Sequence, residues 1–474
     1  MEETGLKDCS STDSSVETFY KDSVVLITGG TGFIGKVLIE KLLRCFEVKR
    51  IYLLLREKKN VKSEERLKEL LQEPIFHVMK NNNPTPPSVF AKVIAIDTNF
   101  QQDRIISDGD RKLLLSEVTV VFNVMASVKF NEHIESALDT NVNCSRKLFD
   151  MVSQMQRIRS IVHVSTFYSN CDRSHIEERV FDDVPFGGHD NILRIFEHLS
   201  APEKDKLIPA ILGPMPNSYT FSKKCAEIMI KQSYAHLPIA IFRPPIVMSA
   251  YMEPIPGWVD NFNGIAGMCI PMTQGKIYCA RGKPDMPSHS VPVDYCVAAL
   301  LAVGAEIRRN PTPHQGSESP MVYNFATDHN NIRWGDYGWW AAHGCETRLG
   351  KIFGRYALGV TKSRIVRQLF VWWFVLQAFT ADLLLAIVGR KRKNLRLVKR
   401  VLALEDAACF FAMHRWTVQN DNMRRVLGGL SEQERNLLQF DIDKLDWKDY
   451  FKNFLPGIKA ALSRCSQRRR KECG

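Results

Sequence analysis

A glycine-rich turn between a short apolar run and a helix near the N-terminus constrains this chain more than any other feature. Residues 24–27 are apolar and mostly β-branched, and Gly29, Gly32 and Gly35 follow them closely. Residues 36–46 then carry apolar side chains at helical spacing. In such a unit the first glycine permits the tight turn and the second lets the backbone approach a pyrophosphate. The third allows close packing of helix on strand. The unit therefore predicts a dinucleotide site at the start of a parallel sheet.

Short apolar, β-branched runs recur along the chain and are separated by segments of helical periodicity. They lie at residues 50–55, 93–96, 118–122, 161–164 and 239–242. Alternation of this kind is typical of a parallel sheet with helices on both faces. We therefore expect a Rossmann-like, doubly wound α/β fold, with the alternation fading beyond about residue 300.

The end of the second run discriminates between dinucleotides. A site for NAD usually places Asp or Glu there, about 20 residues after the glycines, to bind the ribose 2′-hydroxyl. Here Arg56 occupies that place, with Lys58 and Lys59 close behind it and Glu57 between them. A carboxylate repels a 2′-phosphate whereas these cations attract it, so we expect NADPH rather than NADH. Asp97 could accept a hydrogen bond from the adenine amino group, or could be a surface turn residue.

A tyrosine and a lysine stand four residues apart at Tyr219 and Lys223, on one face of a predicted helix. Hydride transfer to a carbonyl leaves an oxyanion that needs a proton, and a tyrosine can supply it if a nearby ammonium lowers its pKa. Ser165 and Thr166 follow the apolar run at 161–164, where either hydroxyl could polarise the carbonyl or merely cap the next loop. His163, inside that run, is expected to be a core residue. The expected cofactor-binding set is Gly29, Thr31, Gly32, Phe33, Ile34, Gly35, Arg56, Asp97, Tyr219 and Lys223.

The distribution of charge and cysteine excludes several other classes. The net charge is +12, and residues 390–400 and 464–474 supply nearly all of it, so a nucleic-acid-binding body is not expected. The twelve cysteines form no Cys-x-x-Cys pair, which favours a reducing compartment and gives no metal site. No Gly-x-Ser-x-Gly elbow of a serine hydrolase follows a strand.

The most apolar stretch of the chain lies at residues 369–388, where Asp382 is the one charged side chain. It is long enough to cross a bilayer core of about 30 Å. Arg364 and Arg367 precede it and a basic run starts at Arg390, so the flanking charges do not fix an orientation. The stretch could span the membrane, lie in its interface or be a buried helix.

Several longer stretches make the chain resemble the alcohol-forming fatty acyl-CoA reductases, above all the insect-type members. These enzymes belong to the extended short-chain dehydrogenase/reductases. The resemblance covers most of residues 20–462 and rests on VVLITGGTGFIGKVLIEKLLR, IYLLLREKK, VHVSTFYSN, PNSYTFSKKCAE, IFRPPIVMSAYMEPIPGWVDN, RWTVQNDNMRRVL and FDIDKLDWKDYFKNFLPGIKAAL.

This resemblance implies reduction of a long-chain acyl-CoA by NADPH to an aldehyde, then by a second NADPH to the primary alcohol. Thr166 or Ser165, Tyr219 and Lys223 match the family's catalytic positions, with Tyr219 donating the proton and Lys223 holding the ribose. It also implies a membrane-associated enzyme whose catalytic part faces the cytosol, with the endoplasmic reticulum as first location and the peroxisome as second.

Four residues depart from the family pattern. Asn123 stands where a His is usual, and Met125 replaces a small residue nearby. Ile96 replaces a Gly and Pro245 replaces a Ser. None of these removes an expected catalytic group, but Asn123 and Met125 lie in a loop expected beside the nicotinamide.

The expected organisation has five parts. They are a disordered tail at 1–22, an NADPH-binding reductase domain at 23–345 with its substrate-binding part at 245–345, a linker at 346–400, a mainly helical C-terminal domain at 401–462 and a basic tail at 463–474.

Two alternatives to the acyl-CoA reductase stay open. One is an NADP-dependent short-chain dehydrogenase acting on a sterol or other lipid carbonyl. The other is a catalytically silent lipid- or partner-binding protein at a membrane surface. Oligomeric state and acyl chain length are not indicated.

Overall fold

The computed structural model describes residues 15–58, 60–82, 87–273, 278–309, 319–337, 358–389 and 392–471. Seven described strands form one parallel sheet in the order β11-β7-β5-β4-β1-β2-β3. Their bounds are β1 Val24–Thr28, β2 Arg50–Leu55, β3 Val93–Asp97, β4 Val120–Asn123, β5 Ser160–Val164, β7 Ile239–Arg243 and β11 Met321–Asn324. The strand order reverses beside β1, and ligands of doubly wound sheets bind outside the strand ends at such a point. The predicted fold is confirmed.

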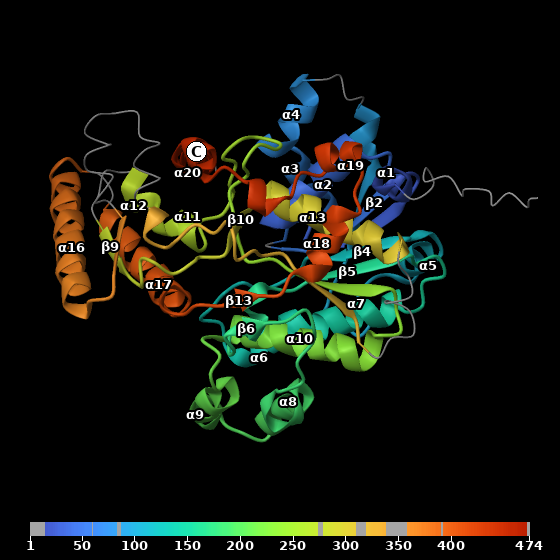
Figure 1. The fold of residues 1–474 in the computed structure, drawn as a ribbon, viewed down its shortest axis with the longest axis horizontal. Helices are drawn as coiled ribbons and strands as arrows, with labels where there is room; N and C mark the ends of the chain where they lie inside the picture. The colour runs from blue at the N-terminus through green and yellow to red at the C-terminus, as the bar shows by residue number, and fades with distance from the viewer. Residues whose placement is uncertain are drawn as a thin grey trace, which may run out of the picture.

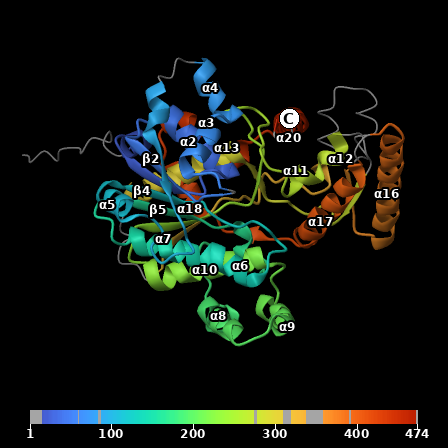
Figure 2. The same ribbon diagram turned by 180° about the vertical axis from the view of Figure 1, so that it is seen from behind.

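Helices cover both faces of this sheet, as Figures 1 and 2 show from opposite sides. On one face α2 packs against α13. On the other face α10 packs against α6 and α7. The connecting helices are α2 Phe33–Cys45, α3 Ser63–Leu71, α4 Pro74–Asn82, α5 Asp108–Glu117, α6 Ile134–Leu138, α7 Cys144–Val152, α8 His189–Glu197, α9 Ala201–Leu212, α10 Ser218–Tyr234 and α13 Val293–Arg309. The strands are buried almost throughout because both sheet faces are covered.

A short helix, α1 Val16–Tyr20, precedes the sheet and packs against α13. Val16, Phe19 and Tyr20 are buried, and the Tyr20 hydroxyl donates a hydrogen bond to the Leu301 carbonyl at 2.8 Å. Residues 15–22 of the predicted disordered tail are therefore part of the fold, because this apolar triplet closes one end of the core. Residues 1–14 lie outside the described part of the chain.

Beyond the carboxyl ends of the sheet strands, small elements form the region predicted to bind substrate. Two parallel strand pairs lie here, β8 with β10 and β9 with β12, beside two short helices. The bounds are β8 Ile246–Met248, β9 Tyr278–Arg281, β10 Ser290–Pro292, β12 Leu358–Thr361, α11 Ile265–Met268 and α12 Ile270–Thr273. Part of the predicted linker, residues 346–357, and the basic residues Arg390 and Lys391 lie outside the described ranges.

The C-terminal region is mainly helical, as predicted, and its elements pack on the reductase part. Helix α16 lies along α17 at one edge of the molecule, and α17 contacts β9 and α11 (Figure 1). Helix α18 contacts β11 and α13, β13 pairs with β6, and α20 contacts α12. The bounds are β6 His175–Ile176, α16 Arg364–Ile387, α17 Asn394–Met413, β13 Thr417–Val418, α18 Asp421–Gly428, α19 Glu432–Leu437 and α20 Trp447–Lys471. The helix α20 thus continues into the predicted basic tail.

Candidate active site

The glycine turn connects β1 to α2 with almost no room for side chains. Gly29 has φ +70°, and a Cβ there would lie 2.8 Å from the Met125 backbone nitrogen. A Cβ on Gly35 would lie 2.3 Å from the Gly29 carbonyl oxygen. Gly32 is the N-cap of α2 and provides no capping side chain, so the first N–H groups of the helix remain open to a ligand. The turn has the shape and polarity that a pyrophosphate needs.

The first turn of α2 is held against the loop that follows β8. The Phe33 ring stacks on Trp258 with ring centroids 5.4 Å apart. Lys36 pairs with Asp260 at 2.8 Å and with Glu73 at 3.2 Å. The Phe33 side chain is therefore used in packing, and only its backbone is placed for the predicted cofactor contact, beside Thr31 and Ile34.

Two arginines lie together at the end of β2. Arg56 follows β2 directly, as predicted, and its side chain is exposed. Arg66, on α3, donates hydrogen bonds to the Arg56 carbonyl and to Thr31 Oγ1. Burial and the nearby Arg56 charge lower the pKa of Arg66. Neither arginine forms an ion pair with any of the described residues, so the pair is suited to an anion such as a 2′-phosphate.

Sequence reasoning missed Arg66 because it lies beyond the strand end, on the following helix. Its sequence signal is weak, because the helix SEERLKELL also contains Lys68 and three glutamates. Lys59 lies outside the described residues. Asp97 ends β3, opposite Leu55 in the register, and is exposed at the same edge of the sheet.

Thr166 and Tyr219 meet at the carboxyl edge of the sheet. Thr166 follows β5, and Tyr219 lies in the first turn of α10, whose N-cap Asn217 accepts a hydrogen bond from Thr220 N at 2.9 Å. Burial raises the pKa of Tyr219 to about 12, and the nearby Thr166 side chain opposes this effect. At neutral pH this phenol is protonated and can donate.

Lys223 lies one turn further along α10 and points to the end of β5. Its Nζ donates to the Val164 carbonyl at 2.7 Å. Burial lowers the pKa of Lys223 to about 8, and the negative charge of Glu227 opposes this change. The predicted lowering of the Tyr219 pKa by Lys223 is not seen. The Lys223 ammonium donates a hydrogen bond to the carbonyl at the end of β5, and burial raises the pKa of Tyr219 instead.

Ser165 and Thr166, which sequence reasoning treated as equivalent, have different partners. The Ser165 hydroxyl donates to the Glu227 carboxylate. Glu227 also accepts from Arg243 at 2.9 Å and 2.5 Å and from Ser169 at 2.8 Å, inside the protein. Thr166 Oγ1 accepts from Tyr168 N at 3.3 Å and so caps the turn after β5, and of the two hydroxyls it is the one that affects the pKa of Tyr219.

Asn123 forms a buried network below the glycine turn. Its side chain accepts from Thr28 Oγ1 at 2.6 Å and donates to Ser145 Oγ at 3.1 Å and to His163 Nδ1 at 3.0 Å. His163 is fully buried, as expected of a core residue, and burial holds its pKa well below the ordinary value. A neutral imidazole accepting from an amide fits this environment. Met125 N donates to Thr28 Oγ1 at 3.3 Å, so the loop expected beside the nicotinamide is fixed through the same threonine.

Comparison with known proteins adds family relationships to this geometry. An NAD-binding family model described as "Male sterility protein" matches residues 27–300, and a second model of the same description matches residues 373–464. The chain is 32% identical over 457 residues to "Fatty acyl-CoA reductase wat" of Drosophila melanogaster, covering 94% of this chain and 85% of the relative. It is 32% identical to "Fatty acyl-CoA reductase 2" of Bos taurus, covering 95% and 86%. It is 30% identical to "Fatty acyl-CoA reductase 1" of Rattus norvegicus, covering 94% and 85%.

Solved structures share the fold. The terminal R domain from the myxalamid PKS-NRPS biosynthetic pathway matches with a TM-score of 0.60 at 17% identity, covering 93% of this chain and 91% of that one. The reductase domain of a nonribosomal peptide synthetase from Mycobacterium tuberculosis matches with a TM-score of 0.58 at 14% identity, covering 94% and 92%. At such identities the likeness establishes the architecture alone.

Proposed function

This chain belongs to the fatty acyl-CoA reductase family and reduces fatty acyl-CoA to fatty alcohol with a nicotinamide cofactor. We propose that the cofactor is NADPH and that an aldehyde is formed as an intermediate. The observation that carries the chemistry is the neighbouring pair Thr166 and Tyr219 at the same sheet edge as the glycine turn. A protonated phenol and a second hydroxyl at one point are what a carbonyl oxygen needs while it gains negative charge.

Thr166 and Tyr219 both act on the carbonyl oxygen of the thioester. NADPH, when bound, supplies a hydride to the carbonyl carbon. The Thr166 hydroxyl orients the oxygen and the Tyr219 hydroxyl gives it a proton, which yields a hemithioacetal. The hemithioacetal hydroxyl then returns its proton to Tyr219 as the carbon–sulfur bond breaks, the CoA thiolate leaves and takes a proton from solvent, and the aldehyde remains. A second reduction at the same two hydroxyls gives the alcohol. Lys223, bonded to the end of β5, fixes the first turns of α10 beside that strand.

The preference for NADPH rests on Arg56 and Arg66. Two guanidinium groups without an ion-pair partner among the described residues suit the 2′-phosphate of NADPH, and NADH carries no such phosphate. We expect Arg66→Gln to weaken NADPH binding by about 10- to 100-fold, as for loss of one charged hydrogen bond, with little change for NADH. Lys68→Gln, an exposed residue of the same helix, is the control for net charge. Equal losses for both cofactors would argue against the role of Arg66.

Membrane association is proposed from α16. Ile365, Leu369, Trp372, Phe379 and Ile387 are between 54% and 76% exposed, and an apolar face of this size is suited to lipid. Among the described helices α16 has the length and composition to cross a bilayer. The catalytic part would face the cytosol, with the endoplasmic reticulum as the first location to examine and the peroxisome as the second.

An assay of membrane fractions tests the function. A panel of saturated and unsaturated acyl-CoAs is supplied with NADPH or NADH, and alcohol is resolved from aldehyde. We expect alcohol with NADPH and little product with NADH. If aldehyde is the end product, the second reduction does not take place. No consumption of any acyl-CoA while NADPH still binds would favour action on a sterol or other lipid carbonyl, or a catalytically silent protein.

A further inference from the structure

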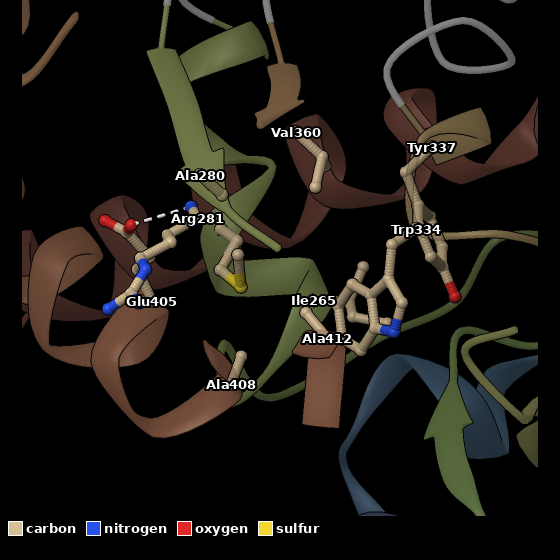
Figure 3. Close-up of a pocket in the computed structure, with 10 residues that line it drawn as sticks. Ile265, Ala280, Arg281, Trp334, Tyr337, Val360, Glu405, Ala408 and Ala412 are labelled. Carbon is tan, nitrogen blue, oxygen red and sulfur yellow. Dashed lines mark hydrogen bonds between the residues drawn. The ribbon is translucent and has the colours of Figure 1, made fainter. Parts of the chain in front are cut away.

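Two buried carboxylates, Glu227 and Glu405, are each 1% exposed, and they join different parts of the molecule. Glu405, on α17, accepts a hydrogen bond from the Arg281 backbone N–H at 2.9 Å (Figure 3). It also accepts from Arg367 of α16 at 2.9 Å and 3.0 Å. The pocket beside it has room for about one water molecule. Glu405 therefore serves to hold α16, α17 and β9 together.

Glu227, on α10, lies instead at the turn after β5, which carries Thr166. The Ser165 hydroxyl donates to its carboxylate, and the side-chain amide of Asn170 donates at 3.5 Å. Ser169 Oγ lies 2.8 Å from Glu227 Oε1 and 2.8 Å from the Thr166 carbonyl oxygen, so it connects the carboxylate to the backbone of Thr166. Three residues of this turn are thus held to α10 through one side chain.

Arg243, on β7, fixes the same carboxylate from the other side. Its Nε donates to Glu227 Oε1 at 2.9 Å and its Nη2 donates to Glu227 Oε2 at 2.5 Å. Arg243 is fully buried, and it also donates to the backbone carbonyls of Glu177 at 3.0 Å and Arg179 at 2.9 Å. Because both carboxylate oxygens are engaged, Glu227 has one fixed position relative to the turn.

Lys223 lies one turn before Glu227 on α10 and is bonded to the same strand end. Its Nζ donates to the last carbonyl of β5 at 2.7 Å. Burial lowers the pKa of Lys223 to about 8, and the negative charge of Glu227 opposes this change. The other charged or titratable groups here are Tyr219 on α10, His163 on β5 and, bonded to Glu227, Arg243 on β7. Of these groups Glu227 alone is an anion that favours the ammonium.

We propose that Glu227 is a positioning residue of the active site, which holds the Thr166 turn against α10 and keeps Lys223 charged. The inference rests on the proposed function, since it gives Glu227 a task towards the hydroxyls that act on the thioester. Without the carboxylate, the turn would lose the acceptor that its side chains share, and Thr166 would no longer be fixed relative to Tyr219. Lys223 would lose the negative charge that favours its protonated form. Neither task requires Glu227 to touch substrate.

The pH dependence of kcat/KM, measured with acyl-CoA and NADPH from pH 6 to pH 10, tests both tasks. For Glu227→Gln we expect a loss of at least about tenfold at pH 6, because the turn is displaced while Lys223 is charged. The alkaline limit of this variant should lie about one pH unit below that of the wild type, as for loss of one neighbouring opposite charge. Glu405→Gln is the matched control, since it removes an equally buried carboxylate that is also paired with an arginine. It should keep the wild-type limit.

Two further variants complete the test. Glu227→Asp keeps the charge on a shorter side chain, so it should lose activity while its alkaline limit stays near pH 8. Should Glu227→Gln not fold, the double variant Glu227→Gln with Arg243→Met takes its place, because it removes both charges of the pair together.

The outcomes separate this proposal from the proposed function. Equal profiles of Glu227→Gln and Glu405→Gln would overturn the positioning role. If wild-type protein consumes no acyl-CoA, the proposed function fails instead. The pH dependence of NADPH binding, in which Lys223 is expected to hold the ribose, then decides whether Glu227 keeps Lys223 charged: the alkaline loss of affinity should move to lower pH in Glu227→Gln and stay in place in Glu405→Gln.

Discussion

At the scale of single residues, two neighbouring hydroxyls at the end of β5 have different tasks. Successive side chains of an extended segment point to opposite sides. Ser165 consequently reaches the buried Glu227–Arg243 pair, and Thr166 reaches Tyr219. Ser165 helps to hold β5, β7 and α10 together, whereas Thr166 is proposed to touch substrate.

Replacement of each hydroxyl should separate these tasks. We expect Thr166→Val to lower kcat by about 10²- to 10³-fold, as loss of one oxyanion donor does, and Thr166→Ser to retain most activity. Ser165→Ala should leave kcat within a few-fold and lower the free energy of unfolding by about 1 kcal/mol, because Glu227 keeps Arg243 and Ser169 as donors. Steady-state kinetics and urea unfolding measure the two effects. A larger loss of kcat in Ser165→Ala than in Thr166→Val would reverse the assignment.

The titration of Lys223 should set the alkaline limit of activity. Its pKa is lowered to about 8, so the side chain carries its positive charge below pH 8 and loses it as the pH rises through that value, which weakens its hydrogen bond to Val164. Tyr219, with a pKa of about 12, stays protonated over the same interval. We expect kcat/KM to fall above pH 8 in the wild type, and Lys223→Arg to move this fall to higher pH. A wild-type profile that is flat through pH 8 would contradict the assignment.

At the scale of elements, α16 is one half of a helical hairpin. Its buried residues Val371, Phe374, Ala378 and Asp382 recur at helical spacing and face the protein. Asp382 accepts hydrogen bonds from the backbone N–H groups of residues 393, 394 and 395 at the start of α17, at 2.9 to 3.0 Å. A carboxylate at a helix N-terminus is stabilising.

A second contact ties the other end of α16 to α17. Arg367 forms two hydrogen bonds, of 2.9 Å and 3.0 Å, with Glu405, which is 1% exposed as a side chain. Because α17 itself packs on β9 and α11, a bilayer-crossing α16 would have to break this pair and the Asp382 cap. For the membrane association proposed above, the hairpin favours α16 lying in the interface with its exposed apolar face towards lipid.

Labelling of introduced cysteines in sealed vesicles distinguishes the two topologies. Arg364 and Arg392 flank α16 and are both exposed. In a background with Cys9, Cys45, Cys345, Cys409, Cys465 and Cys473 replaced by Ser, we expect Arg364→Cys and Arg392→Cys each to react with a membrane-impermeant maleimide on the side of the catalytic part. A spanning helix would protect one of the two until detergent is added. Leu376→Glu, on the exposed face, should release the protein from membranes.

Sequence patterning predicted elements made of local runs and missed those that depend on packing. The runs at 50–55 and 93–96 became β2 and β3 within one residue, because apolar β-branched residues favour buried strands wherever they lie. The four-residue strand β11 was not predicted, since it lies where the alternation has faded and gains its place only by pairing with β7. The proximity of Arg66 to Arg56 likewise follows from how α3 packs, which no local pattern encodes.

At the scale of the whole molecule, the C-terminal region and the reductase part form one body. Glu434 of α19 accepts hydrogen bonds from Val16 N at 2.7 Å and from Arg309, thereby joining the last quarter of the chain to α1 and α13. A Cβ on Gly457 of α20 would lie 1.9 Å from the Gly257 carbonyl oxygen, so α20 packs backbone to backbone on the loop after β8. The candidate site depends on this packing, because Phe411 of α17 contacts Phe130, whose ring in turn contacts Tyr219.

Such a body should unfold in a single transition, and weakening the C-terminal contact should destabilise the cofactor site far from it. Glu434→Ala removes the acceptor of the Val16 N–H and the carboxylate paired with Arg309, for which we expect a loss of about 3 kcal/mol of unfolding free energy. Glu432→Ala, on an exposed position of the same helix, should change stability by less than about 0.5 kcal/mol. In urea, tryptophan fluorescence and NADPH binding should share one midpoint in each variant, and both should shift together in Glu434→Ala. Separate midpoints, with NADPH binding unmoved in that variant, would mean that the C-terminal helices are an independent domain.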